Sequence, residues 1–198
     1  FKRNKHQQHI AQLPKLSQSV DDVEFFYAPA DFRETLLAKI AGATQRICII
    51  ALYLEQDDGG KDVLQAIYDA KRQRPALDVR ILVDWHRAQR GRIGAAASNT
   101  NADWYCRMAA ENPGVDVPVY GVPINTREAL GVLHYKGFII DDVVLYSGAS
   151  LNDVYLHRHD KYRYDRYQWI RNAQMADIMF SWVDKNLVQG RGVNRLDN

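Results

Sequence analysis

The stretch LGVLHYKGFIIDD, residues 130–142, reads as an apolar strand that ends in two aspartates. The next stretch, VVLYSGAS (143–150), is also apolar and rich in β-branched residues. Two such runs joined by two polar residues predict a β-hairpin, although Asp-Asp is less favoured in a tight turn than Asn-Gly. The hairpin is unusual because a histidine and a lysine interrupt its first strand.

The two cations of this strand are predicted to share one face. Side chains alternate between the faces of a strand, so His134 and Lys136 point the same way. The hairpin register then places Lys136 opposite Ser147 and His134 opposite Ala149. Small residues opposite two cations predict a hollow above the sheet, with Ser150 as a further hydrogen-bond donor beside it.

A hollow of this kind suits a phosphate group. An ammonium and an imidazole repel each other unless an anion lies between them, and phosphate accepts hydrogen bonds from both. Neutral imidazole is also a nucleophile toward phosphorus and can divide a transfer into two steps through a covalent intermediate. The alternative is that His134 and Lys136 lie along a solvated edge, with the lysine extending into water.

Outward from the hairpin, strands and helices alternate along the chain. Asp31 and Glu34 form a capping-box pattern that predicts a helix beginning there. Apolar periodicity predicts strands at 23–28, 46–54, 77–85 and 115–122, and helices at 31–43, 60–74, 102–111 and 175–187. This order predicts an α/β domain with a mixed, largely parallel sheet flanked by helices.

Composition restricts the classes of function. The 198 residues are 46% hydrophobic, enough for a real core, and the net charge of +2 is too small to indicate a nucleic-acid binder. Two cysteines without metal-ligand spacing fit a reducing, cytosolic compartment. No apolar run approaches the roughly 20 residues that span a bilayer. Residues 1–20 are expected to form a basic arm, 21–188 the domain, and 189–198 a polar linker.

A second segment, HRHDKYRYDRYQWIR (157–171), mixes cations with aromatic residues. Such a composition suits an anionic surface, and Lys161, Arg163, Arg166 and Trp169 are candidates for gripping anionic lipid headgroups. A solvated helix or loop face explains the same residues equally well.

The hairpin and its continuation resemble the signature motif of the phospholipase D superfamily. The matching residues are His134, Lys136, Asp141, Gly148 and Asn152. The resemblance implies an α/β fold that forms one half of a pseudo-twofold site with two such motifs, the second from the same chain or from an identical subunit. It also implies that His134 is the nucleophile or the acid/base, and that Lys136 holds the phosphate.

Two motif positions need comment. Asp141 falls on the opposite strand face or in the turn, so we expect it to orient the strand or the site rather than touch phosphate. The superfamily usually has Gly-Ser where this chain has Gly148-Ala149-Ser150. Either Ser150 donates from a shifted position or Asn152 supplies most of the donors.

Longer segments, including FFYAPADFRETLLAKI and SGASLNDVYLH, resemble the N-terminal half of the phospholipase-D-type bacterial phosphatidylserine synthases. That resemblance implies transfer of a phosphatidyl group from CDP-diacylglycerol to L-serine, with release of CMP and with no cofactor or metal. It further implies a cytoplasmic enzyme associated peripherally with the inner membrane surface, anionic lipids as partners, and a linker at 189–198 toward a second half.

Two loops follow predicted strands, where open α/β sheets bind ligands. Arg87 and Arg90 are candidates for holding the diphosphate or the cytidine, against the alternative of a solvated basic loop. Glu55, Asp57 and Asp58 are candidates for recognising the serine ammonium, although a helix cap explains the two aspartates as well. No ligand spacing supports a metal there.

Four alternative functions remain open. The first two are other lipid enzymes of the superfamily, a cardiolipin synthase or a hydrolytic phospholipase. The third is a nuclease that completes its site by homodimerisation, because this chain carries one motif. The fourth is a membrane-binding module without catalytic activity.

Overall fold

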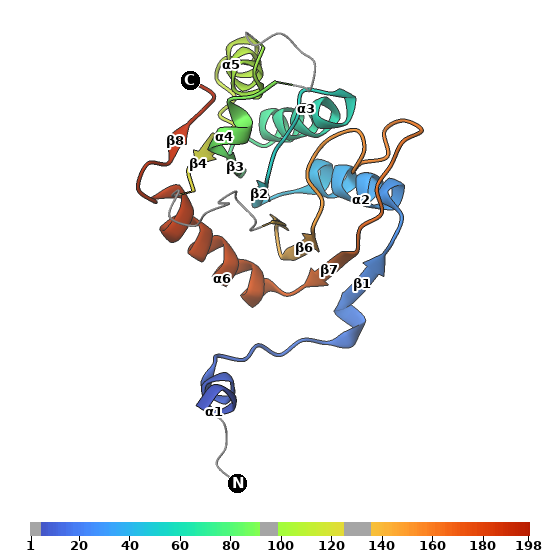
Figure 1. Ribbon diagram of the computed structural model, residues 1–198, viewed down its shortest axis with the longest axis vertical. Coiled ribbons are helices and arrows are strands. Elements are labelled where there is room, and N and C mark those ends of the chain that lie inside the picture. Colours follow the sequence, from blue (N-terminus) through green and yellow to red (C-terminus); the bar gives the residue numbers. More distant parts are fainter. Residues whose placement is uncertain (1–4, 92–98, 125–135) are drawn as a thin grey trace.

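An eight-stranded sheet forms the centre of the computed structural model, which describes residues 5–91, 99–124 and 136–198 (Figure 1). Its strands are β1 (Val23–Phe26), β2 (Arg46–Ala51), β3 (Asp78–Asp84), β4 (Val119–Val122), β5 (Gly137–Ile140), β6 (Val143–Ser147), β7 (Tyr167–Arg171) and β8 (Asn194–Arg195). The helices are α1 (Lys5–Gln12), α2 (Pro29–Gly42), α3 (Asp58–Gln73), α4 (Trp85–Ala88), α5 (Asn101–Glu111) and α6 (Ala173–Val183), with the short 3₁₀ helix η1 (Val20–Asp22) and the short π-helix η2 (Asp184–Val188).

The strand order is β1-β7-β6-β5-β2-β3-β4-β8. Among the described strands, β2 pairs in parallel with β3 and β3 with β4, and every other neighbouring pair is antiparallel. The prediction of a mixed α/β sheet is therefore confirmed, but the expectation that it is largely parallel holds only for β2, β3 and β4. The difference arises because β5 of the β5–β6 hairpin pairs with β2 in the antiparallel sense. β7 then pairs antiparallel with β6, and β1 pairs antiparallel with β7.

Helices cover both faces of the sheet. Alternate residues of β2 supply the two cores: Ile47 and Ile49 face α2 and α3, whereas Cys48 and Ile50 face α6. This arrangement explains why β2 is apolar and buried at every position after Arg46, as is typical of a strand covered on both faces.

The predicted β5–β6 hairpin is confirmed in register. Ile140 pairs with Val143 and Phe138 with Leu145, which leaves a two-residue turn. Asp141 adopts φ of +50°, in the left-handed region that this turn requires and that aspartate tolerates better than most residues.

The predicted start of α2 is wrong. The helix begins at Pro29, and its N-cap residue Ala28 makes no side-chain cap. Proline is pre-organised for the first helical position, so it starts the helix two residues before the Asp31–Glu34 pattern. The predicted C-terminal helix is confirmed as α6, with η2 continuing it.

The last residues are not only a linker, contrary to the expectation for 189–198. Asn194 and Arg195 form β8 beside β4, and the Asp197 carboxylate accepts a hydrogen bond from the Val119 backbone N–H at 3.0 Å. A Cβ atom on Gly121 would lie 3.0 Å from the Leu196 side chain. The glycine, which has no side chain, therefore leaves room for Leu196 beside β4. At the other end, α1 stands apart from the sheet in Figure 1.

Candidate active site

The carboxyl ends of the parallel strands β2 and β3 lie at one edge of the sheet. Because β5 runs antiparallel to β2, with Gly137 opposite Ile50, the chain entering β5 reaches this same edge. The chain leaving β6 returns there as well, and Leu151 forms a parallel bridge to Leu54. Topology therefore brings four segments, the chain after β2, after β3, before β5 and after β6, to one edge, which we call the carboxyl edge.

Lys136 lies at the carboxyl edge, one residue before β5. Its ammonium donates a hydrogen bond to the Gly148 carbonyl oxygen at 2.7 Å, one residue beyond the Ser147 that the predicted register places opposite Lys136. His134 lies outside the described residues, so its place on the same face as Lys136 stays a prediction. A Cβ on Gly148 would lie 2.9 Å from an Asp165 carboxylate oxygen, which explains the glycine at this crowded position.

Asp141 is at the opposite edge of the sheet. Its carboxylate accepts hydrogen bonds from the backbone N–H groups of Thr44 at 3.0 Å, Gln45 at 2.8 Å and Arg46 at 3.1 Å. Partial burial alone would raise the pKa of Asp141, but these hydrogen bonds outweigh it and hold the pKa below its usual value. At about 3.3 Å per residue, Asp141 is about 16 Å along the strand from Lys136. It fastens the hairpin turn to the start of β2.

Replacing Asp141 with asparagine is expected to lower the free energy of unfolding at neutral pH by about 1–3 kcal/mol, because an amide accepts fewer charge-assisted hydrogen bonds. Since the folded pKa of Asp141 is depressed, this difference is full above about pH 5 and disappears as the pH falls below about 4 toward the folded pKa. Urea denaturation of both proteins across this range measures it. Asp142→Asn is the matched control because, among the described residues, the Asp142 carboxylate has one ion-pair partner, Arg46, at 3.9 Å.

Tyr53 joins two of the predicted binding residues. Its hydroxyl accepts a hydrogen bond from the Asn152 amide nitrogen at 3.2 Å, and the Arg87 guanidinium centre lies 4.8 Å from its ring centroid. The Arg87 Nε is buried and has no hydrogen-bond partner among the described residues. Burial, followed by the neighbouring Tyr155 and Glu55, raises the pKa of Tyr53 to about 12. The phenol is therefore neutral and able to donate a proton in a hydrogen bond.

Local structure fixes the positions of these side chains. The Asp84 carboxylate caps α4 by accepting the Arg87 backbone N–H at 2.9 Å, which turns the arginine over Tyr53. The Asn152 carbonyl oxygen accepts the Tyr155 backbone N–H at 2.9 Å, which leaves the amide nitrogen facing Tyr53. The sequence predicted Arg87 and Asn152 but not Tyr53, whose signal was its place just after an apolar strand.

Ser150 and Arg90 differ in position. Ser150 is buried at 1% exposure between β6 and the bridge at Leu151, so it belongs to the carboxyl edge. Arg90 is exposed, and its backbone carbonyl accepts the Asn101 N–H at 3.0 Å. No contact joins the Arg90 guanidinium to Tyr53 or Asn152 among the described residues.

The acidic loop before α3 serves as a cap. Asp57 accepts hydrogen bonds from the backbone N–H groups of Gly60 at 2.9 Å and Asp153 at 2.8 Å. Burial raises the pKa of Asp57 to about 6 against the lowering effect of these bonds. Asp58 is exposed and pairs with His159 at 2.7 Å. Asp58, Asp153 and His159 have ligand atoms within 4.8 Å of one another and are the one described group able to hold a metal ion.

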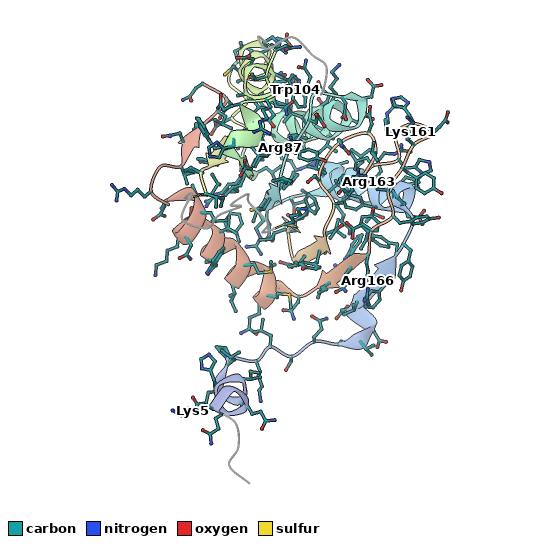
Figure 2. All side chains as sticks on the ribbon, viewed as in Figure 1. Lys5, Arg87, Trp104, Lys161, Arg163 and Arg166 are labelled. Atoms are coloured by element: carbon teal, nitrogen blue, oxygen red, sulfur yellow. The ribbon has the colours of Figure 1, made fainter. Side chains whose placement is uncertain are left out.

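The basic aromatic segment runs over the surface as a loop and then enters β7. Lys161, Arg163 and Arg166 are exposed and labelled in Figure 2. The Arg163 guanidinium lies 5.7 Å from the Tyr155 ring centroid, and the Tyr155 backbone bonds to Asn152. This segment therefore also approaches Tyr53, Asn152 and Arg87, which we call the Tyr53 cluster. Trp169 is different, because it lies in β7, packs against the core and supports the Lys39 ammonium 3.9 Å above its ring centroid.

No helix in the described part of the chain is long and apolar enough to span a membrane. No protein-family profile matches the chain.

Relatives match its full length. It is 85% identical over 198 residues to the Escherichia coli (strain K12) CDP-diacylglycerol–serine O-phosphatidyltransferase PssA, covering 100% of this chain and 44% of that protein. The crystal structure of phosphatidylserine synthase from Haemophilus influenzae superposes with a TM-score of 0.91 at 45% identity, again over 100% of this chain and 44% of the other.

A more distant structure shares the fold alone. Nuc from Salmonella typhimurium, a phospholipase D family member, superposes with a TM-score of 0.58 at 22% identity, over 85% of this chain and 95% of Nuc. The chain thus spans less than half the length of the synthases it matches but nearly the whole of this smaller protein. By sequence and fold, the chain closely resembles part of the phosphatidylserine synthases, and it shares its fold with Nuc.

Proposed function

We propose that the full-length protein transfers a phosphatidyl group from CDP-diacylglycerol to L-serine, giving phosphatidylserine and CMP. The observation that carries this proposal is the 85% identity, over the whole chain, to an enzyme named for this reaction. The carboxyl edge supports it, because Lys136, Asn152, Tyr53 and the buried Nε of Arg87 supply neutral and cationic donors suited to a phosphodiester.

The reaction proceeds in two steps. One motif histidine attacks the phosphorus of CDP-diacylglycerol, the phosphorus–oxygen bond to CMP breaks, and CMP leaves after protonation by the other histidine. The serine hydroxyl then gives its proton to that second histidine and displaces the phosphatidyl group from the first. His134 is one of these two residues, and the other comes from a second phospholipase-D-like half, in the same chain or in an identical subunit.

Lys136 and the Tyr53 cluster have different roles in this mechanism. The Lys136 ammonium stabilises charge that develops on the phosphoryl oxygens in the transition state. Asn152 and Arg87 flank Tyr53 and bind the remaining phosphate oxygens, whereas Asp141 acts from the far edge by positioning the hairpin. The exposed Lys161, Arg163 and Arg166 contact anionic headgroups, so that the enzyme works peripherally at the inner membrane surface from the cytoplasm.

The test is an acceptor comparison with the full-length protein in mixed micelles of CDP-diacylglycerol. L-serine, glycerol 3-phosphate and water compete as acceptors, and the lipid products are separated. Phosphatidylserine as the main product supports the proposal. Phosphatidic acid in the presence of serine indicates a hydrolytic phospholipase, and a glycerophosphate product indicates a different phosphatidyltransferase. Either result contradicts the proposal.

Replacing Tyr53 with phenylalanine is expected to lower kcat about tenfold, equal to about 1.4 kcal/mol, because a phosphate donor is lost and the Asn152 amide is left without its partner. Initial rates of CMP release measure the effect. Tyr146→Phe is the matched control, because Tyr146 is 56% exposed on β6. Equal rates for the Tyr53 variant and the control would show that the Tyr53 hydroxyl does not contribute to catalysis.

A further inference from the structure

The chain that follows β2 presents a glutamate at the carboxyl edge. Glu55 comes directly after Leu54, which forms the parallel bridge to Leu151, and two residues after Tyr53. Side chains alternate along an extended segment, so Tyr53 and Glu55 point to the same side while Leu54 enters the core. The Glu55 side chain therefore lies beside the Tyr53 cluster.

Buried side chains of α5 hold the backbone on both sides of Glu55. The Tyr105 hydroxyl donates a hydrogen bond to the Leu54 carbonyl oxygen at 2.5 Å, and the Asn101 side-chain oxygen accepts the Gln56 backbone N–H at 3.0 Å. Tyr105 is 1% exposed and Asn101 is 3% exposed. The position of Glu55 is therefore fixed before any ligand binds, as a discriminating binding group requires.

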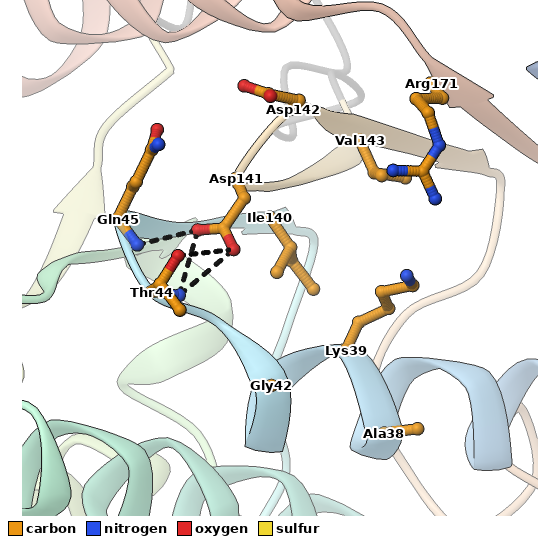
Figure 3. Close-up of a pocket in the computed structure, with 10 residues that line it drawn as sticks. All are labelled: Ala38, Lys39, Gly42, Thr44, Gln45, Ile140, Asp141, Asp142, Val143 and Arg171. Carbon is orange, nitrogen blue, oxygen red and sulfur yellow. Dashed lines mark hydrogen bonds between the residues drawn. The ribbon is translucent and has the colours of Figure 1, made fainter.

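Glu55 is partly buried, and its carboxylate has no hydrogen bond or ion pair to any described residue. Four other carboxylates in the loops of the carboxyl edge are buried or partly buried, and each accepts a backbone N–H: Asp57, Asp84, Asp153 and Asp165. Asp141 lies at the opposite edge, where the backbone N–H groups of Thr44 and Gln45 hold it (Figure 3). Because a partly buried carboxylate without a partner is costly, Glu55 is suited to receive a positive group.

Charges of both signs act on the Tyr53 hydroxyl. Burial is the main cause of the raised pKa of Tyr53, and Tyr155 and the charge of Glu55 add to it. Arg87 and Arg163 act in the opposite direction. The cations suited to a phosphodiester and the Glu55 carboxylate therefore surround the same phenol.

The acceptor of the proposed reaction matches this arrangement. The hydroxyl of L-serine must reach the phosphorus, and its amino group is on the adjacent carbon atom. The group that binds the ammonium must therefore lie next to the donors that bind the phosphate, as Glu55 does. A carboxylate attracts a primary ammonium, and it repels acceptors whose net charge is negative.

We propose that Glu55 binds the ammonium of the acceptor L-serine and selects serine over alcohols that lack this group. The inference rests on the proposed transfer reaction and names a residue that determines its acceptor specificity. The sequence offers Glu55, Asp57 and Asp58 for this role. Asp57 caps α3 and Asp58 pairs with His159, which leaves Glu55.

The test compares two acceptors with the full-length protein and its Glu55→Gln variant in mixed micelles of CDP-diacylglycerol. The acceptors are L-serine and 3-hydroxypropanoate, which keeps the hydroxyl and the carboxylate of serine but has no amino group. We expect Glu55→Gln to lower kcat/KM for serine about tenfold or more, mainly by raising KM, because a charge-assisted contact is lost. The kcat/KM for 3-hydroxypropanoate should not fall.

Two further variants serve as references. Glu55→Asp keeps the negative charge on a shorter side chain, so its loss of serine selectivity should be smaller than that of Glu55→Gln. Glu24→Gln removes an exposed carboxylate from the edge strand β1 and should change neither acceptor's kinetics.

Exchange of labelled CMP into CDP-diacylglycerol separates this inference from the transfer reaction, because exchange does not use serine. Glu55→Gln should retain exchange far better than transfer to serine. A wild-type KM for serine in Glu55→Gln, or equal losses with both acceptors, overturns the role of Glu55. Absence of phosphatidylserine from the products of the wild-type protein contradicts the transfer reaction itself.

Discussion

Replacing His134 with alanine is expected to reduce turnover of the full-length enzyme to roughly one-thousandth or less, because a covalent step or its proton transfer loses the group that performs it. The fold should remain intact, since the side chain is predicted to face the hollow rather than the core. CMP release from CDP-diacylglycerol with saturating serine measures the rate, and thermal unfolding monitors the fold.

The control for this variant is His9→Ala in the exposed N-terminal arm. That substitution should leave the rate unchanged, because α1 is distant from the carboxyl edge in Figure 1. Near wild-type turnover in the His134 variant would remove this histidine from the mechanism. It would also favour the alternative given by the sequence pattern, in which His134 and Lys136 lie along a solvated edge of the sheet.

Replacing Lys136 with alanine is expected to lower kcat about 100-fold, the effect of losing one preorganised donor to the transition state. KM should change less, because the charge that the ammonium stabilises is greater in the transition state than in the bound substrate. Steady-state kinetics over a range of CDP-diacylglycerol concentrations separates the two constants.

Lys61→Ala, on the exposed surface of α3, is the control for general loss of positive charge. An unchanged kcat in the Lys136 variant would contradict the proposed role. The lysine would then serve only to hold the Gly148 carbonyl, to which its ammonium donates at 2.7 Å.

Local patterns in the sequence predicted the parts of the site that depend on neighbouring residues. The hairpin register followed from strand alternation and a two-residue turn, and the pairing of Ile140 with Val143 and of Phe138 with Leu145 confirms it, with Asp141 in the turn. The helix cap at Asp57 also followed from local chemistry. The strand pairing lies within one hairpin and the cap within one helix turn.

Features that depend on contacts between distant segments were not predicted. The sequence does not show that β7 pairs with both β1 and β6, nor that residues after Gly192 return to form β8. Tyr53 was missed for the same reason, because its partners Arg87 and Asn152 come from two other loops. Such pairings depend on the whole sheet and leave no periodic signal in any one segment.

The most direct test of the proposed mechanism is exchange of labelled CMP into CDP-diacylglycerol in the absence of serine. A covalent phosphatidyl-histidine forms and reverts without an acceptor, so we expect exchange in the full-length wild-type protein and its loss in His134→Ala. Exchange that requires serine, or that persists at the wild-type rate in the variant, would contradict a stepwise transfer through the histidine of this strand.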